Sequence, residues 1–103
     1  MSEANVYCIV LSRREDVTHE RFLHCWLVEH RRLIERLPHL IDIQLLPVAE
    51  PTDGGPDGVG LLFFAGAAEM AEALASDAAQ ELRRHTATFA RSDQALRLLL
   101  VAG

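Results

Sequence analysis

The sequence predicts a single α+β domain in which four strands and two helices follow one another in the order β-α-β-β-α-β. The chain has 103 residues, which is the size of one domain. Half of the residues are hydrophobic and 24% are charged, which is a globular composition. The hydrophobic period also switches several times between the spacing of a strand and that of a helix.

The first half of the chain predicts a strand, a long helix and a second strand. Residues 5–12 form a short β-branched and aromatic run between polar residues, which is typical of a strand. Residues 18–37 have helical spacing; Thr18 is a good N-cap, and Pro38 disfavours helical geometry at the residue before it. Residues 40–46 predict the second strand, which is followed by the turn-rich segment PVAEPTDGGPDG.

The second half predicts a strand, an interrupted helix and a last strand. Residues 59–65 and 95–101 are the strands. The Ala-rich stretch over 67–90 is helical, with Ser76 and Asp77 as an interruption and a new cap. This order is that of the ferredoxin-like fold, with a four-stranded antiparallel sheet.

The strands also predict an assembly. Three of them are apolar on both faces, whereas 40–46 alternates partly, as an edge strand does. Two helices can cover only one face of a four-stranded sheet in this topology. We therefore expect a homodimer in which the sheets of two copies pack together.

Charge and hydropathy exclude several classes of partner. The net charge of -5 argues against nucleic acid. There is no basic leader, and no run approaches the ~20 apolar residues of a membrane span, so we expect no membrane association and a cytoplasmic location. All ten basic residues are arginine, which excludes Schiff-base and P-loop lysines. Cys8 and Cys25 are interpreted as reduced thiols.

No metal site is predicted. His19, Glu20 and His24 look like a zinc-protease motif, but the two histidines lie about 140° apart on a helix and cannot share a metal ion. The glycines after residue 53 lack the setting of a dinucleotide-binding loop and are interpreted as turn glycines: Gly54, Gly55, Gly58 and Gly60.

His30 is the candidate functional residue. At about 100° per residue it falls in the middle of the apolar arc that contains Phe22, Trp26 and Leu33. One interpretation is a core histidine bonded to a backbone carbonyl. The other is a histidine in an apolar pocket, where burial and one partner tune its pKa for proton transfer. Three residues could face it: Asp42, Tyr7 and Gln44.

The segment THERFLHCWLVEHRRLIERLPHL resembles the signature of EthD-domain proteins, which belong to the dimeric α+β barrel superfamily. The family pattern is a helical Phe, a Trp four residues on, a His four further and a Leu-Pro turn, which correspond to Phe22, Trp26, His30 and Leu37-Pro38. Phe89 resembles a second family aromatic. The element order extends the resemblance over residues 1–103.

This resemblance implies a small pocket between sheet and helices that binds a small apolar or aromatic oxygenated molecule without a cofactor. The implied function is that of an isomerase, cyclase or monooxygenase acting on an aromatic, lactone or polyketide-like substrate. His30 would be the acid or base, and Trp26, Phe22, Tyr7 and Phe89 would contact the substrate. The alternatives are a non-catalytic binding or accessory protein, and a dimer whose own side chains fill the pocket.

Overall fold

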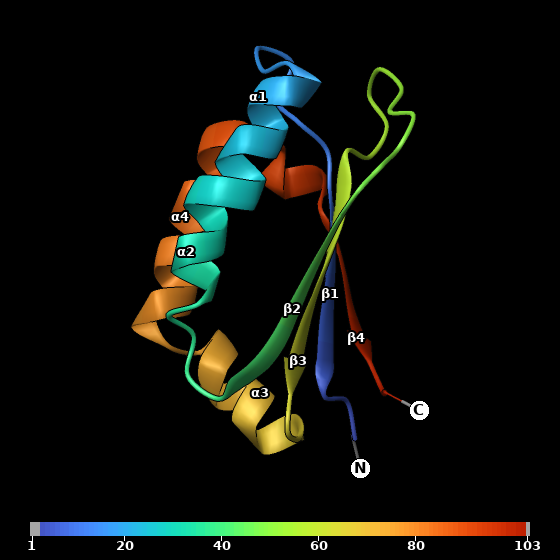
Figure 1. Ribbon diagram of the computed structural model, residues 1–103. Helices are drawn as coiled ribbons and strands as arrows, with labels where there is room; N and C mark the ends of the chain where they lie inside the picture. The colour runs from blue at the N-terminus through green and yellow to red at the C-terminus, as the bar shows by residue number, and fades with distance from the viewer. Residues whose placement is uncertain (1–2, 103) are drawn as a thin grey trace.

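The predicted order of elements is confirmed by a computed structural model, which describes residues 3–102 (Figure 1). The strands are β1 (Val6–Leu11), β2 (Leu40–Pro47), β3 (Gly58–Phe64) and β4 (Leu96–Leu100). The helices are α1 (His19–His24), the π-helix η1 (Cys25–His30), α2 (Arg31–Ile34), α3 (Ala67–Leu74), α4 (Asp77–Phe89) and the short 3₁₀ turn η2 (Ser92–Gln94).

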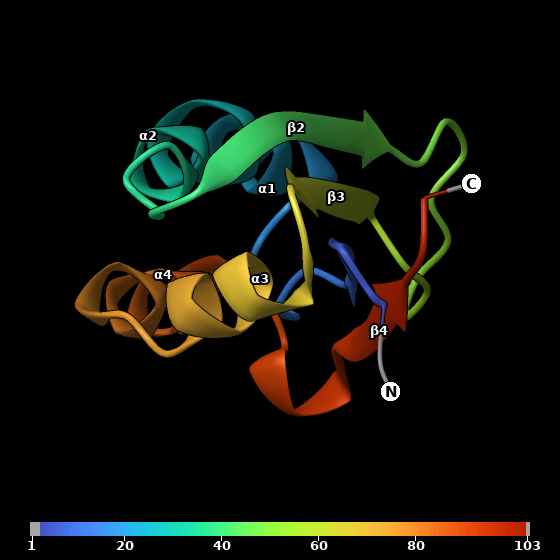
Figure 2. The same ribbon diagram turned by 90° about the horizontal axis from the view of Figure 1, so that it is seen from below.

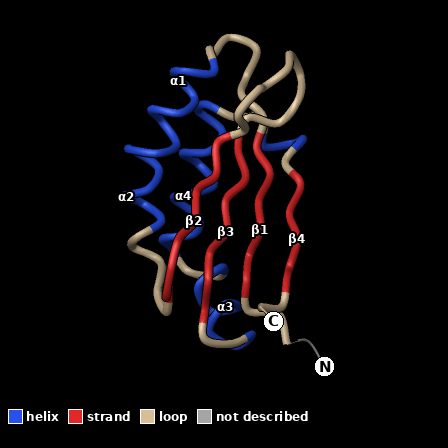
Figure 3. The backbone as a smooth tube through the Cα atoms, turned by 45° about the vertical axis from the view of Figure 1, so that its right-hand side comes forward, coloured by secondary structure: helices blue, strands red, loops and turns tan. Residues whose placement is uncertain are grey.

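The strands form one antiparallel sheet in the order β2-β3-β1-β4 (Figure 3). Strand β2 lies at an edge, as its partly alternating sequence predicts. The helices from α1 to α4 lie against the same face of the sheet (Figures 1 and 2). The opposite face is therefore not covered by any helix in the described part of the chain.

The structure decides which side of β1 faces the helices. Tyr7 and Ile9 pair with Leu62 and Gly60 of β3, and Tyr7 packs against the core cluster beneath α2 and α4. Val6, Cys8 and Val10 alternate with them and point to the open face. Val6 and Cys8 are nevertheless buried, because β1 is a central strand between β3 and β4.

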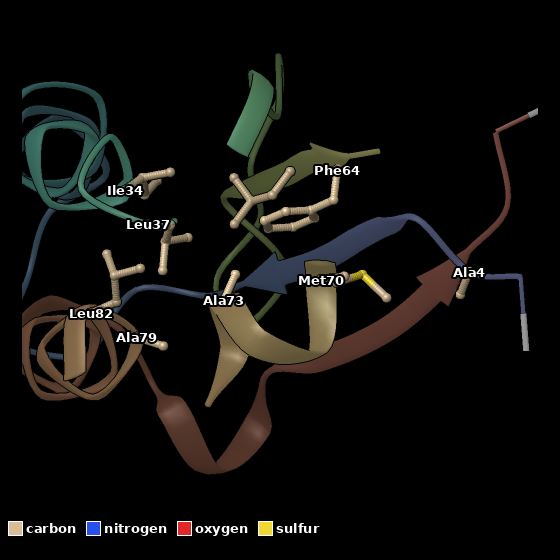
Figure 4. Close-up of a cluster of buried hydrophobic side chains, with 9 residues drawn as sticks. Ala4, Ile34, Leu37, Phe64, Met70, Ala73, Ala79 and Leu82 are labelled. Atoms are coloured by element: carbon tan, nitrogen blue, oxygen red, sulfur yellow. The ribbon is translucent and has the colours of Figure 1, made fainter. Parts of the chain in front are cut away.

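Two apolar clusters fill the space between sheet and helices. One joins α2, α3 and α4 to β3, and Figure 4 shows Ile34 and Leu37 lying opposite Leu82 and Ala79. The other contains Phe22, Trp26 and Phe89, which come from α1, η1 and α4. The first cluster is therefore mostly aliphatic, whereas the second is rich in aromatic side chains.

The long helix differs from the expected continuous α-helix over 18–37. It starts where predicted, since the Thr18 hydroxyl accepts a hydrogen bond from the Arg21 backbone N–H at 3.1 Å. Its middle is a π-helix, and its last helical residue is Ile34. Beyond it, the N–H of Leu37 donates to the carbonyl of Ile34, a tighter turn that ends the helix before Pro38.

Asp57 is a fully buried carboxylate that joins the ends of three segments. Its Oδ2 accepts a hydrogen bond from the Arg13 backbone N–H at 2.7 Å, and its Oδ1 accepts from the Arg13 guanidinium at 2.6 Å and from His19 Nδ1 at 2.7 Å. Burial alone would raise its pKa, but these donors outweigh it and hold the pKa below the usual value.

We expect Asp57→Asn to destabilise the protein by about 3 kcal/mol at pH 7, because Arg13 and His19 lose a buried charged partner. The lowered pKa means that the carboxylate stabilises the fold above the unfolded pKa of 3.8 and that this contribution is lost as the pH falls below it. Urea unfolding at pH 7 and pH 3 should therefore show a difference between the two proteins that shrinks in acid. A difference independent of pH would contradict this assignment.

Candidate functional site

A cavity of about 60 Å³ lies between the sheet and the helices. Its lining comes from β1, β2, β3 and β4 on one side and from η1, α2, α3 and α4 on the other, and it is mostly apolar. Polar groups inside it belong to His30, Tyr7 and Thr86. The Thr86 hydroxyl donates to the Leu82 carbonyl at 2.8 Å, which leaves His30 and Tyr7 as the buried or half-buried groups of the lining whose hydrogen atoms are free for a ligand.

His30 is paired with a second histidine. Its Nδ1 lies 2.9 Å from Nδ1 of His85, and the two rings stack at 16° with centroids 5.1 Å apart. Phe89 packs edge-on against His30, with the ring centroids 5.4 Å apart. His30 is 6% exposed, whereas the His85 side chain is 21% exposed, so the pair runs from the cavity toward the surface.

The π-helix η1 ends at His30, and its buried side chains are Cys25, Trp26 and His30. A π-helix is wider than an α-helix, with hydrogen bonds to the residue five positions back, and it shifts the direction of the side chains that follow. Turns of this kind are rare in proteins overall, but those that occur are often found at functional sites. The 100° spacing used for the sequence does not describe this segment, although it aims His30 at the correct side of the helix.

The environment keeps His30 neutral. Burial, and then the charge of a protonated His85, lower the pKa of His30 to about 4. The two Nδ1 atoms cannot both carry a proton in this contact, because one of them must accept the hydrogen bond that the other donates.

Glu29 favours one of the two arrangements. Its Oε1 lies 3.6 Å from Nε2 of His85, so a proton on that nitrogen faces a carboxylate. His85 Nδ1 then accepts, and His30 Nδ1 donates. His30 Nε2 is left with a lone pair, and no group in residues 3–102 makes a hydrogen bond with it. In this tautomer, His30, which lines the apolar cavity, keeps an unprotonated Nε2.

Trp26 forms a wall of the cavity, and two glycines of β3 make room for it. A Cβ at Gly58 would lie 2.4 Å from Cζ3 of Trp26, and one at Gly60 would lie 3.5 Å from Cζ2. The interpretation of these two as turn glycines is wrong, because both lie inside a strand. Gly54, with φ of 80°, is a turn glycine as expected.

The other candidate residues lie in or directly behind the cavity wall. Tyr7 lines the cavity with His30 and Trp26. Phe22 and Phe89 lie outside the lining and brace it, with Phe22 5.5 Å from Trp26 and 5.4 Å from Phe89 between ring centroids.

The partner of His30 is His85, which differs from the three residues expected from the sequence. Asp42 and Gln44 were wrong candidates, because they pair with Phe63 and Leu61 and so point to the open face of the sheet. The helical period of α4 could have indicated His85, which lies four residues before Phe89 and three after Leu82, both buried.

No group of three histidine, cysteine or acidic side chains in residues 3–102 is placed to hold a metal ion. His19 is bound to Asp57, and the nearest carboxylate to His24 is Glu29, at 3.6 Å. Within the same range, no helix is long and apolar enough to cross a membrane.

Comparison of the sequence with protein-family models and with curated proteins found no match. Solved structures, by contrast, match over nearly the whole chain and define the class as the ferredoxin-like α+β fold. A dimeric protein of unknown function with this fold from Bacteroides fragilis has a TM-score of 0.70 at 11% identity, over 94% of each chain.

Two further structures bear on the resemblance to EthD-domain proteins. An ethyl tert-butyl ether D (EthD) family protein from Bacillus halodurans has a TM-score of 0.76 at 14% identity, over 96% of this chain and 99% of that one. SnoaB, a cofactor-independent oxygenase from Streptomyces nogalater, has a TM-score of 0.73 at 11% identity, over 99% and 95%. The resemblance stated from the helical Phe-Trp-His pattern is confirmed at the level of the fold.

Proposed function

We propose that the protein is a cofactor-free enzyme that moves a proton on a small apolar oxygenated molecule, such as a lactone, a quinone or a polyketide-like compound. The observation that carries the proposal is a buried histidine that lines an apolar cavity, has a lowered pKa and is paired with a second histidine through Nδ1. A cofactor-independent oxygenase with the same fold supports a reaction without a cofactor.

The reaction that suits this site is isomerisation. His30 Nε2 removes a proton from a carbon next to a carbonyl group, the electron pair moves onto the carbonyl oxygen, and the imidazolium returns the proton to another carbon. A pKa of about 4 makes His30 alone a weak base.

The histidine pair offsets this weakness. When Nε2 gains a proton, the proton on Nδ1 can pass to His85, which is more exposed and lies near Glu29. The positive charge then leaves the buried ring for one in contact with solvent and close to a carboxylate, where it is more stable. His85 thereby acts as the partner that makes His30 an effective base.

The remaining candidate residues have supporting roles in this proposal. Trp26 excludes water, and the Tyr7 phenol donates a hydrogen bond to the substrate oxygen on which charge develops. Phe22 and Phe89 hold Trp26 and His30 in place from behind. No metal or cofactor takes part.

The proposal can be tested with α-angelica lactone, a small unconjugated lactone that isomerises by proton transfer. NMR in D₂O would follow isomerisation and deuterium uptake with the wild-type protein, His30→Asn and His39→Asn. His39 is a matched control, because it is an exposed histidine outside the cavity and its φ of 64° suits asparagine.

We expect acceleration by the wild-type protein and by His39→Asn, and a loss of at least 100-fold in His30→Asn. Equal rates for wild type and His30→Asn would refute the role of His30. Binding of the lactone without isomerisation or exchange would instead favour a non-catalytic binding or accessory protein.

We also propose that the protein is a homodimer that packs the two open sheet faces together. Large apolar side chains of this face are exposed in the single chain: Leu46 at 49%, Leu96 at 54%, Leu98 at 42% and Leu100 at 38%. An apolar face of this kind is typical of an interface. One of the structures with the same fold is described as dimeric, which supports the proposal.

Light scattering at micromolar concentration should give about 23 kDa, twice the 11.5 kDa of the chain. Leu98→Asp should lower this to the mass of a monomer, because it places a charge in the apolar interface. Leu99→Asp is the control, since Leu99 is exposed but pairs with Tyr7 and points to the opposite side of the sheet. A folded wild-type monomer, or equal effects of the two variants, would contradict the dimer.

A further inference from the structure

The lining of the cavity has two exposed residues, and both are arginines. Arg83 comes from α4 and Arg97 from β4, whereas the other lining residues are buried or half-buried. Because they are the exposed part of the lining, these two side chains mark the mouth of the cavity. The mouth therefore lies between α4 and β4 and carries positive charge.

These arginines have few partners inside the chain. The Arg97 side chain makes no hydrogen bond or ion pair with any residue of the described range 3–102. Both terminal nitrogens of Arg83 contact the Leu74 carbonyl oxygen, each at a long 3.4 Å. No carboxylate contributes to the cavity lining. Six other arginine side chains of the described residues form hydrogen bonds or ion pairs, as Arg13 does with Asp57. The Arg97 side chain has no such partner in residues 3–102, so it is available for a ligand at the mouth of the cavity.

Arg97 also stays accessible in the proposed dimer. It pairs with Ile9 on the side of the sheet that faces the helices, opposite to the open face with Leu96 and Leu98. Packing of two open faces would therefore leave the mouth of each cavity free.

We propose that the cavity binds a carboxylate-bearing molecule, whose anionic end is held by Arg97 with Arg83 as a second cation and whose apolar body extends toward Trp26 and His30. This inference rests on the proposed function for the identity of the site, and it adds the substrate class. A guanidinium binds a carboxylate through two parallel hydrogen bonds, a geometry that a neutral oxygen does not match.

The overall charge of the protein strengthens the argument. With a net charge of -5, the chain as a whole repels anions. Two cations at the entrance of an apolar cavity reverse that field locally and attract an anion to the one place where its apolar part can be buried. A neutral ligand gains no such charge–charge attraction from the two arginines.

The single tryptophan gives a direct measurement, because Trp26 lines the cavity. We would titrate the protein with 3-phenylpropanoate and with the neutral 3-phenylpropanamide, and follow Trp26 fluorescence excited at a wavelength that the phenyl group does not absorb. The variants are Arg97→Gln and, as a matched control, Arg84→Gln, since Arg84 is an exposed arginine of α4 outside the lining.

We expect the acid to bind at least tenfold more tightly than the amide, a difference of about 1.4 kcal/mol. Arg97→Gln should remove this preference and leave the affinity for the amide unchanged, and Arg84→Gln should keep the preference. Equal affinities for acid and amide, no binding of the acid, or an equal loss of preference in Arg97→Gln and Arg84→Gln would each overturn the inference.

The binding preference for the acid and the lactone isomerisation can be tested independently of each other. His30→Asn should retain the preference for the acid, because binding of the carboxylate does not use the imidazole. A preference for the acid together with failure of the lactone experiment would leave a carboxylate-binding pocket and refute only the proposed reaction.

Discussion

His30→Leu is expected to lower turnover at least 100-fold while leaving the protein folded and, in mild acid, more stable than the wild type. The loss of turnover follows from removal of the base. Near pH 7.5 the stability should change little, because leucine suits the apolar site and the partner, His85, is 21% exposed and can bond to water instead.

The higher stability of His30→Leu in mild acid follows from the lowered pKa of His30 in the folded wild-type protein. His30 has a pKa of about 4 in the folded protein and about 6.5 in the unfolded chain, so the unfolded state binds more protons between these values. The wild-type protein therefore loses stability as the pH falls from 6.5 toward 4, by about 2 kcal/mol at pH 5 from this group. The His30→Leu variant has no imidazole at this position, so its stability does not fall for this reason.

Urea unfolding at pH 7.5 and pH 5 would measure both effects. A sharp fall in stability at pH 7.5, with the affinity for 3-phenylpropanoate unchanged, would show that His30 is a structural core histidine. That result would remove the functional assignment even if the variant were inactive, because unfolding would then explain the lost activity.

Gly58→Ala is expected to displace Trp26 and to close or distort the cavity. The added Cβ would lie 2.4 Å from Cζ3 and 2.6 Å from Cη2 of an indole that is 1% exposed, so the ring has to move within a packed core. Overpacking of this severity costs about 3 kcal/mol. Trp26 fluorescence should shift, and 3-phenylpropanoate binding should weaken at least tenfold.

Gly54→Ala is the control for this variant. Its Cβ would meet nothing within 4 Å, but the positive φ of 80° strains any residue with a side chain, at a cost of about 1 kcal/mol. The control should therefore lose some stability without any change in fluorescence or binding. If Gly58→Ala behaved in the same way, the close fit between Trp26 and β3 would be wrong.

Local patterns in the sequence determined the element order, the N-cap at Thr18, the new cap at Ser76 and the burial of His30. These features depend on residues within a few positions of one another, and hydrophobic periodicity reports them directly. The apolar character of both faces of the strands likewise indicated an open face that a partner must cover.

Only the tertiary structure decided the chemistry of the site. His30 and His85 are 55 residues apart in the chain, and their contact depends on how α4 packs against η1. The same packing sets Trp26 over Gly58, turns Tyr7 rather than Cys8 toward the helices, and places Arg83 and Arg97 at one mouth. Such contacts join elements whose relative positions are set by the fit of whole surfaces, and no local period in a single sequence encodes them.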